Sequence, residues 1–302
     1  MRDDLMHLLG ICGQRAGFGN FRTVRVEDDR GWQREHLIFT RAGEGADRED
    51  IPAVFLRPPD GHPPVPAVIY AHAHGNRYGT GHTELLDGRP ALHGPYAPDL
   101  RRLGIAALCF DLPAFGARQK PTESARAKAL LWQGRTLFGQ MLLELRSGVD
   151  FLAAHPVVAP DRIGGLGFSM GSTLVWWLAA LDDRLRATSA LCSFADLEQL
   201  VQTGPHDGHG IYMTVPGLLP LARSGQIAGL TAPRALQICV GLKDWSTPEM
   251  AFVRGRLDLE AAYATAGAAE RLHFHVEPEA GHEESAAMRQ AVLSFLDQEL
   301  CA

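Results

Sequence analysis

The chain has 302 residues, of which 46% are hydrophobic and 21% are charged, and its formal net charge is −6. These values predict a globular protein with a full core rather than disorder or coiled coil, and a weakly acidic chain lacks the basic surface of nucleic-acid binders. No apolar run approaches the roughly 20 residues of a membrane span, and the N-terminal apolar stretch is too short for a secretory signal, so we expect a soluble, cytoplasmic protein.

In chain order, residues 21–57 hold three short runs that mix apolar with charged positions. These runs are Phe21–Glu27, Arg34–Thr40 and Ile51–Arg57. Such mixing is typical of an antiparallel edge with one solvated face. The segment PPDGHPPVP at 58–66 then breaks the chain, and its character changes.

From Pro66 onward, nearly continuous apolar runs alternate with helical patterns. The predicted strands are Ala67–Ala71, Ile105–Phe110, Ile163–Phe168, Ala187–Leu191, Ala235–Val240 and Leu272–Val276, and the predicted helices are 97–103, 137–152, 170–181, 248–267 and 285–299. This alternation predicts an α/β fold with a mainly parallel central sheet flanked by helices, whose strands are covered on both faces. A stretch rich in proline and glycine at 193–229 is interpreted as a small lid-like insertion, and we expect a single domain over 1–302.

The five cysteines are widely spaced and include no CxxC pair, so they predict no disulfide framework. The chain has 32 glycines and 19 prolines among its 302 residues. Together they make up about 17% of the chain, against an average of about 12%. Since no period or low-complexity block accompanies them, we expect tight turns. The glycines expected to turn the backbone around a site are Gly75, Gly167, Gly171, Gly241 and Gly281.

The strongest local motif is Gly167-Phe168-Ser169-Met170-Gly171, which follows an apolar run and precedes a helical pattern. A G-x-S-x-G motif in this strand–turn–helix context is typical of a nucleophile elbow. The turn is tight enough to require small residues around Ser169. It also lets the backbone N–H of Met170, at the helix start, stabilise a developing oxyanion.

A nucleophilic serine needs a base and an orienting carboxylate, which should follow later strands in the order Ser, acid, His. Asp244 follows the run ALQICVGLK, and His282 follows LHFHVEPEAG. We therefore predict Asp244 as the acid and His282 as the base. The competitors are Glu249, at a predicted helix start, Asp207, within the insertion, and His273 and His275, which alternate in a strand.

An early strand ends in the histidine-rich run His72-Ala73-His74-Gly75. One hypothesis is an oxyanion loop, in which a backbone N–H near His74 joins that of Met170. The other is a metal site, in which His72 and His74 act together with His82, His93 or Asp111. We favour the oxyanion loop because it explains the serine, acid and histidine together.

These residues resemble the α/β-hydrolase superfamily, and within it the dienelactone hydrolase-like and acetyl-xylan-esterase-like bacterial serine hydrolases. The resemblance runs from about residue 50 to the end and rests on HAHG at 72–75, FDLPAFG at 110–116, GFSMGSTLVWWLAALDDR at 167–184, APRALQICVGLKDWSTP at 232–248 and VEPEAGHE at 276–283. It implies an eight-stranded sheet and cofactor-free ester hydrolysis, with Ser169 as nucleophile, Asp244 as acid and His282 as base.

The chain departs from this family pattern at two positions. Dienelactone hydrolases usually carry cysteine at the elbow, where this chain has Ser169, which argues against dienelactone as the substrate. The common His-Gly of the oxyanion loop reads His72-Ala73, so the second donor is either Ala73 or His74.

Pocket residues should come from loops at the same sheet edge. Tyr78, His209, Tyr212 and Trp245 are the predicted substrate-binding residues, beside His74, Arg77 and Phe115 as further candidates. Arg77, Arg118 and Arg135 could bind a substrate carboxylate, although a solvated arginine is the simpler interpretation of each.

The sequence thus predicts a serine hydrolase that cleaves a carboxylic ester of small or medium size through an acyl-enzyme, with neither metal nor organic cofactor. Its partner is the small-molecule ester, with no nucleic acid and no membrane, and a homodimer is compatible with the sequence. The alternatives are cleavage of an amide, lactone or C–C bond by the same triad, a metal-dependent hydrolase built on His72 and His74, and a non-catalytic binding protein of the same fold.

Overall fold

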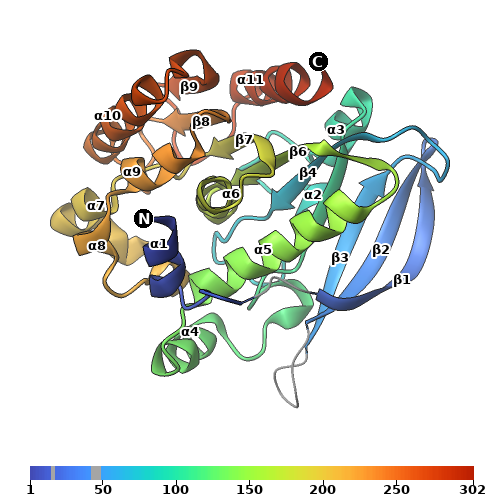
Figure 1. Ribbon diagram of the computed structural model, residues 1–302, viewed down its shortest axis with the longest axis horizontal. Coiled ribbons are helices and arrows are strands. Elements are labelled where there is room, and N and C mark those ends of the chain that lie inside the picture. The colour runs from blue at the N-terminus through green and yellow to red at the C-terminus, as the bar shows by residue number, and fades with distance from the viewer. Residues whose placement is uncertain (15–17, 42–48) are drawn as a thin grey trace.

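The computed structural model describes residues 1–14, 18–41 and 49–302. Within these ranges, nine strands form one sheet in the order β1-β2-β3-β5-β4-β6-β7-β8-β9 (Figure 1). The strands are β1 Phe18–Asp29, β2 Trp32–Arg41, β3 Glu49–Arg57, β4 Val65–Ala71, β5 Ala106–Phe110, β6 Val158–Phe168, β7 Leu185–Leu191, β8 Ala235–Gly241 and β9 Leu272–Glu277.

Helices of the described ranges precede, connect and follow these strands. They are α1 Arg2–Leu8, α2 Glu84–Asp87, α3 Ala97–Leu103, α4 Glu123–Trp132, α5 Leu137–Ala154, α6 Met170–Leu181, α7 Leu197–Thr203, α8 Leu218–Leu221, α9 Ser224–Ala228, α10 Glu249–Thr265 and α11 Ala286–Leu296, with the short turns η2 Gly116–Arg118, η3 Pro205–Gly208, η4 Ile211–Met213, η5 Gly229–Thr231, η6 Ala269–Arg271 and η7 Asp297–Cys301. None of them combines the length and the apolar composition that a membrane-spanning helix requires.

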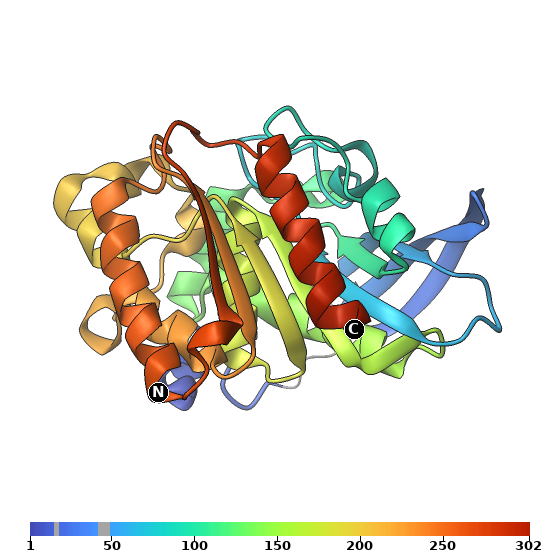
Figure 2. The same cartoon turned by 90° about the horizontal axis from the view of Figure 1, so that it is seen from above.

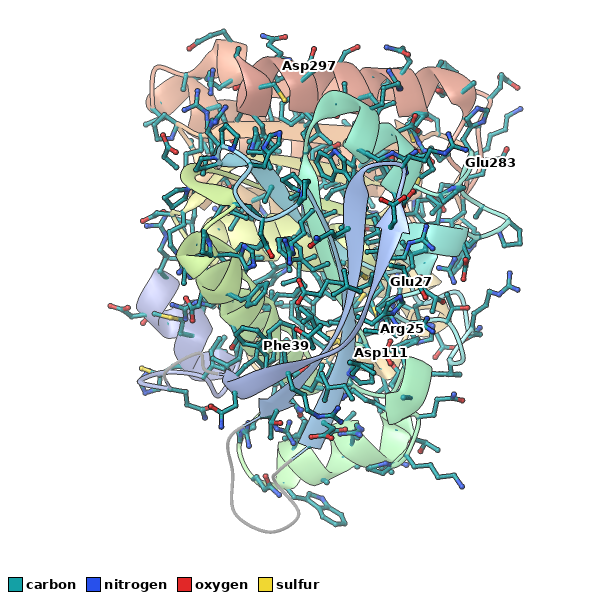
Figure 3. All side chains as sticks on the ribbon, turned by 90° about the vertical axis from the view of Figure 1, so that its right-hand side faces the viewer. Arg25, Glu27, Phe39, Asp111, Glu283 and Asp297 are labelled. Atoms are coloured by element: carbon teal, nitrogen blue, oxygen red, sulfur yellow. The ribbon has the colours of Figure 1, made fainter. Side chains whose placement is uncertain are left out.

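The predicted antiparallel edge is confirmed. Strand β1 pairs with β2, β2 with β3, and β3 with β5, all antiparallel. Leu37 and Phe39 of β2 are buried, while their neighbours along the strand are partly exposed, as the two-residue period of a strand facing a core on one side requires. Figure 3 faces this edge and labels Arg25 and Glu27 of the outermost strand and Phe39 of the strand behind it.

The remaining pairs, from β5 through β4, β6, β7 and β8 to β9, are all parallel. Every predicted apolar run forms a strand, and β4, β5 and β8 are buried along their whole length. Two expectations are corrected. The described sheet has nine strands rather than eight. Strand β9 is half-buried throughout because it lies at the sheet edge and has a neighbour on one side only.

Helices cover both faces of the sheet, as predicted. The larger core cluster joins the sheet to α5 and α6, and the second cluster joins the opposite face to α3 and α11. Figures 1 and 2 show α11 alone on its side of the later strands, with α5 and α6 on the other side. In α5, Met141, Leu145 and Val149 are fully buried because the four-residue spacing puts them on one stripe of the helix.

The predicted insertion folds into α7, η3, η4, α8 and α9, between strands β7 and β8. In Figure 1 this segment lies at one side of the molecule, beyond the ends of the central strands. Asp196 is the N-cap of its first helix, α7, and its carboxylate accepts a hydrogen bond from the amide of Gln199 at 3.0 Å.

The interpretation of Arg118 as a solvated side chain is wrong. Arg118 is buried, and it donates to the carboxylates of Glu144, on α5, at 2.6 Å and of Glu49, on β3, at 2.7 Å. Burial alone would raise the pKa of Glu49, but hydrogen bonds and charge from Arg118 and Arg126 lower that pKa to about 2. The arginine therefore links the antiparallel edge to α5.

Candidate active site

The GFSMG motif forms the sharp turn between β6 and α6 that the sequence predicts. Ser169 has φ 57° and ψ −119°, a conformation that is unusual for a residue with a side chain. The turn leaves no room for a Cβ on either flanking glycine. A Cβ on Gly171 would lie 1.8 Å from the Ala71 carbonyl oxygen, and one on Gly167 would lie 2.4 Å from the Gly171 carbonyl carbon.

Three loops at the carboxyl ends of β6, β8 and β9 bring together Ser169, Asp244 and His282. The Nε2 atom of His282 lies 2.9 Å from Ser169 Oγ, and its Nδ1 lies 2.8 Å from Asp244 Oδ2. Because the buried carboxylate accepts the Nδ1 proton, Nε2 is left with a lone pair facing the serine hydroxyl. The serine hydroxyl, the imidazole and the carboxylate are thus in one hydrogen-bonded line.

Ser246 also belongs to this cluster, and the sequence reasoning missed it. Its backbone N–H and its hydroxyl both donate to Asp244 Oδ1, at 2.8 and 2.7 Å, and its Oγ lies 3.0 Å from His282 Nδ1. An aspartate whose side chain accepts from the backbone two residues later is a common turn motif. The sequence DWS therefore carried a local signal for this contact.

The oxyanion loop lies directly against the N-terminus of α6. A Cβ on Gly171 would come within 3.0 Å of the His72 carbonyl oxygen, which shows how closely the two segments approach. The Ala73 N–H donates to the buried carboxylate of Glu84 at 3.1 Å, so it is engaged elsewhere. The His72 ring holds the Ala73 carbonyl at 3.1 Å, and in a trans peptide the following N–H, that of His74, points the opposite way.

Both ring nitrogens of His72 and of His74 contact other groups of the protein at hydrogen-bond distance. His72 Nε2 accepts from the Leu112 amide at 3.1 Å while Nδ1 contacts the Ala73 carbonyl. His74 Nδ1 accepts from the Asn76 amide at 3.0 Å, and Nε2 lies 2.9 Å from Glu123. Burial lowers the pKa of His72 to about 4.

These contacts leave neither ring a nitrogen that is free to bind a metal ion. His82, a third residue of the metal hypothesis, is paired with Asp111 at 2.7 Å. Within residues 1–14, 18–41 and 49–302, no group of three or more His, Cys, Asp or Glu side chains is arranged to hold a metal. The metal hypothesis has no support in this arrangement.

A cavity of about 840 Å³ opens onto Ser169, Met170 and His282. All four predicted substrate-binding residues line it, namely Tyr78, His209, Tyr212 and Trp245. Trp245 is 56% exposed, whereas Tyr212 is only 3% exposed. Of the further candidates, His74 lines the cavity, but Phe115 does not, because it is buried and stacks behind Tyr78 with ring centroids 5.2 Å apart.

Glu123 is a buried carboxylate in the cavity wall that the sequence reasoning missed. It accepts hydrogen bonds from the Tyr78 hydroxyl at 2.7 Å and the Tyr212 amide at 3.1 Å, beside its contact with His74. Burial alone would raise the pKa of Glu123, but these bonds, led by that of His74, lower it. Glu123 thereby ties the oxyanion loop to the insertion.

The competing residues take no part in the serine–histidine–carboxylate cluster. Glu249 is exposed at the first position of α10, and Asp207 lines the cavity without a bond to His282. His275 is paired with Glu277, and the His273 ring packs on Phe295.

A protein of Bacillus subtilis (strain 168) that is named "Putative hydrolase YtaP" is 35% identical to the chain over 298 residues, which cover 98% of each sequence. The chain belongs to the same protein family as YtaP. No family model matches the chain.

Solved structures of esterases share the fold of this YtaP-family chain. "Methylesterase BT1017" is similar with a TM-score of 0.74 and 18% identity, over 98% of this chain and 62% of that longer chain. The acetyl xylan esterase from Paenibacillus sp. R4 is similar with a TM-score of 0.63 and 18% identity, over 99% of this chain and 93% of that chain. The predicted α/β-hydrolase fold is thereby confirmed.

Proposed function

We propose that the protein is a serine hydrolase that cleaves a carboxylic ester through an acyl-enzyme. The observation that carries the proposal is the 2.9 Å contact between His282 Nε2 and the Ser169 hydroxyl, on a strained turn, with Asp244 behind the ring. A serine, a base and an orienting carboxylate in hydrogen-bond contact are the parts that nucleophilic acyl transfer requires.

In the first step, Ser169 Oγ attacks the ester carbonyl while its proton passes to His282 Nε2. Asp244 keeps the ring in the tautomer that can accept this proton and stabilises the imidazolium that forms. The carbonyl oxygen becomes an oxyanion, for which we propose the backbone N–H groups of Met170 and His74 as donors. Collapse of this intermediate expels the alcohol, which takes the proton from His282 and leaves the acyl group on Ser169.

In the second step, water takes the place of the alcohol. His282 removes a proton from water, whose oxygen attacks the acyl carbonyl, and the same two amides hold the second oxyanion. Collapse of this second intermediate breaks the bond between the acyl carbon and Ser169 Oγ, which takes the proton back from His282, and the carboxylic acid leaves.

Two observations support a small or medium ester as substrate. A cavity of about 840 Å³ is within the usual range of small-molecule sites, about 300–1,000 Å³. The similar solved structures are a methylesterase and an acetyl xylan esterase by name. Because both names state an esterase, we assign the ester as the bond class that this chain cleaves.

A matched ester and amide with the same acyl and aryl groups test this proposal. We expect turnover of the ester and at least about a 10³-fold loss of kcat for Ser169→Ala, with the variant folded as judged by circular dichroism. Turnover of the amide alone, or an ester hydrolysis rate that Ser169→Ala leaves unchanged, would contradict the proposal.

We also propose that the protein acts in the cytoplasm. All five cysteines are free thiols, and Cys109, Cys192 and Cys239 are buried in the core, where burial raises the pKa of each thiol. Fractionation of the native host with an antibody to the chain tests this assignment, and recovery outside the cytoplasmic fraction would overturn it.

A further inference from the structure

A second hollow lies on the insertion, next to the active-site cavity. It is an open groove of about 590 Å³ between the segments that carry α7 and α8. Its wall is mostly apolar, and the apolar side chains that matter here are Leu197, Val201, Met213, Val215, Leu218 and Leu219.

The groove and the active-site cavity share one wall. Asp207, His209, Gly210 and Ile211 line both hollows. His209 is fixed in this wall because its Nε2 contacts the Ser246 carbonyl at 3.1 Å. Ser246 in turn donates to Asp244, so the shared wall begins directly beside the proposed catalytic residues. The groove therefore adjoins the active-site cavity along this shared wall.

Polarity changes along the groove. The shared wall carries the polar side chains Asp207 and His209, whereas the remaining groove residues are mostly apolar. Val201 is 42% exposed and Leu219 is 40% exposed, so both present apolar surface to solvent. Apolar surface that a protein leaves open beside a polar cavity fits a ligand with a polar head and an apolar tail.

We propose that this groove is a binding subsite for the apolar acyl chain of the ester, whose carbonyl lies at Ser169. The proposal rests on the proposed function and extends it to substrates with an acyl chain longer than acetyl. Each methylene of the chain that leaves water for the groove should raise kcat/KM about three- to fourfold.

Nitrophenyl acetate and nitrophenyl octanoate, both below the concentration at which they form micelles, test the proposal with the full-length protein. A charge placed in the groove should expel the chain without disturbing the fold, because Val201 and Leu219 are exposed. We expect Val201→Glu and Leu219→Glu to lower kcat/KM for octanoate at least about tenfold and to leave the value for acetate unchanged. Leu257→Glu, at a 62% exposed position of α10, is the matched control and should change neither value.

An octanoate-to-acetate ratio that is the same in wild type, Val201→Glu and Leu219→Glu would overturn the proposal. So would a wild-type enzyme that hydrolyses acetate but not octanoate. Analytical ultracentrifugation of the same proteins measures their oligomeric state and so tests the alternative that a second copy of the chain occupies the groove. A dimer that Val201→Glu dissociates, with the ratio unchanged, would make the groove a contact between chains instead. Failure of wild type to hydrolyse either ester would refute the proposed function itself.

Discussion

At the scale of single residues, Ser246 fixes the proposed catalytic acid from behind. It donates to Asp244 Oδ1 through its hydroxyl and its amide, while His282 takes the other oxygen. We predict that Ser246→Ala lowers kcat about tenfold and changes KM by less than about twofold, because the hydroxyl that is lost, although Ser246 lines the cavity, donates its hydrogen bond to the charged Asp244. Steady-state kinetics on the ester measures this effect.

The control for Ser246→Ala is Ser124→Ala, which removes another hydroxyl from the same cavity wall and leaves the contacts of Asp244 in place. A loss of kcat that is equal in the two variants would argue against a specific role of Ser246.

His72 gives the fold a pH dependence. Its pKa is about 4 in the folded chain because it is buried, against an ordinary value of 6.5. Between these pH values the unfolded chain binds a proton that the folded chain does not bind, so stability falls as the pH drops from 6.5 to 4. Relative to pH 7, His72 should lower the unfolding free energy by about 2 kcal/mol at pH 4.5.

Urea unfolding of His72→Gln at pH 7 and pH 4.5 measures this contribution. We predict that the difference in unfolding free energy between the two pH values shrinks by about 2 kcal/mol relative to wild type. The same substitution at exposed His62 should leave the difference unchanged. An equal difference in wild type and His72→Gln would refute the assignment.

The three residues of the proposed triad were predictable because each comes directly after an apolar, strand-like run. They also occur along the chain in the expected order of serine, acid and histidine. Glu123 and Glu84 were not, because each acts through a fold-dependent contact. Glu123 meets His74, which lies 49 positions away, and Glu84 meets Ala73 only after α2 folds back. A carboxylate in a helical segment reads as a solvated one until the fold shows its partner.

At the scale of elements, the turn between β6 and α6 depends on the missing side chain of Gly171. We predict that Gly171→Ala costs at least about 3 kcal/mol of unfolding free energy, since its Cβ would meet the Ala71 oxygen at 1.8 Å. Because the clash pushes α6 away from the oxyanion loop, kcat should fall as well. Thermal unfolding and ester kinetics measure the two effects.

Gly281 supplies the control, and it corrects an expectation. The sequence suggested that Gly281, beside His282, turns tightly, but a Cβ there would meet nothing within 4 Å and its φ is not in the left-handed region. Gly281→Ala should therefore change stability by less than about 0.5 kcal/mol. Equal destabilisation by the two substitutions would contradict the packing argument.

The strands themselves were predictable, and their order was not. Apolar runs mark each buried strand because both of its faces are covered. Strand β5 lies between β3 and β4, and this arrangement depends on contacts between segments far apart in the sequence. The outer strand β1 extends from Phe18 to Asp29, beyond the predicted Phe21–Glu27, because pairing with β2 orders polar residues that have no apolar signal.

At the scale of the whole molecule, buried charges hold the antiparallel edge to the rest of the sheet. Arg118 bonds to Glu144 of α5 and to Glu49 of β3. We predict that Arg118→Met costs about 3–5 kcal/mol of unfolding free energy, because two carboxylates lose their buried partner. Denaturant unfolding measures this cost, and Arg102→Met, at a solvated position, is the matched control. A cost below about 1 kcal/mol would contradict the role of Arg118 as the link.

The central claim is that Ser169 is an activated nucleophile, and a fluorophosphonate probe tests it most directly. We predict that the probe labels wild type at one site, that mass spectrometry places the adduct on Ser169, and that folded Ser169→Ala is not labelled. No labelling of folded wild type, or equal labelling of Ser169→Ala, would contradict the claim.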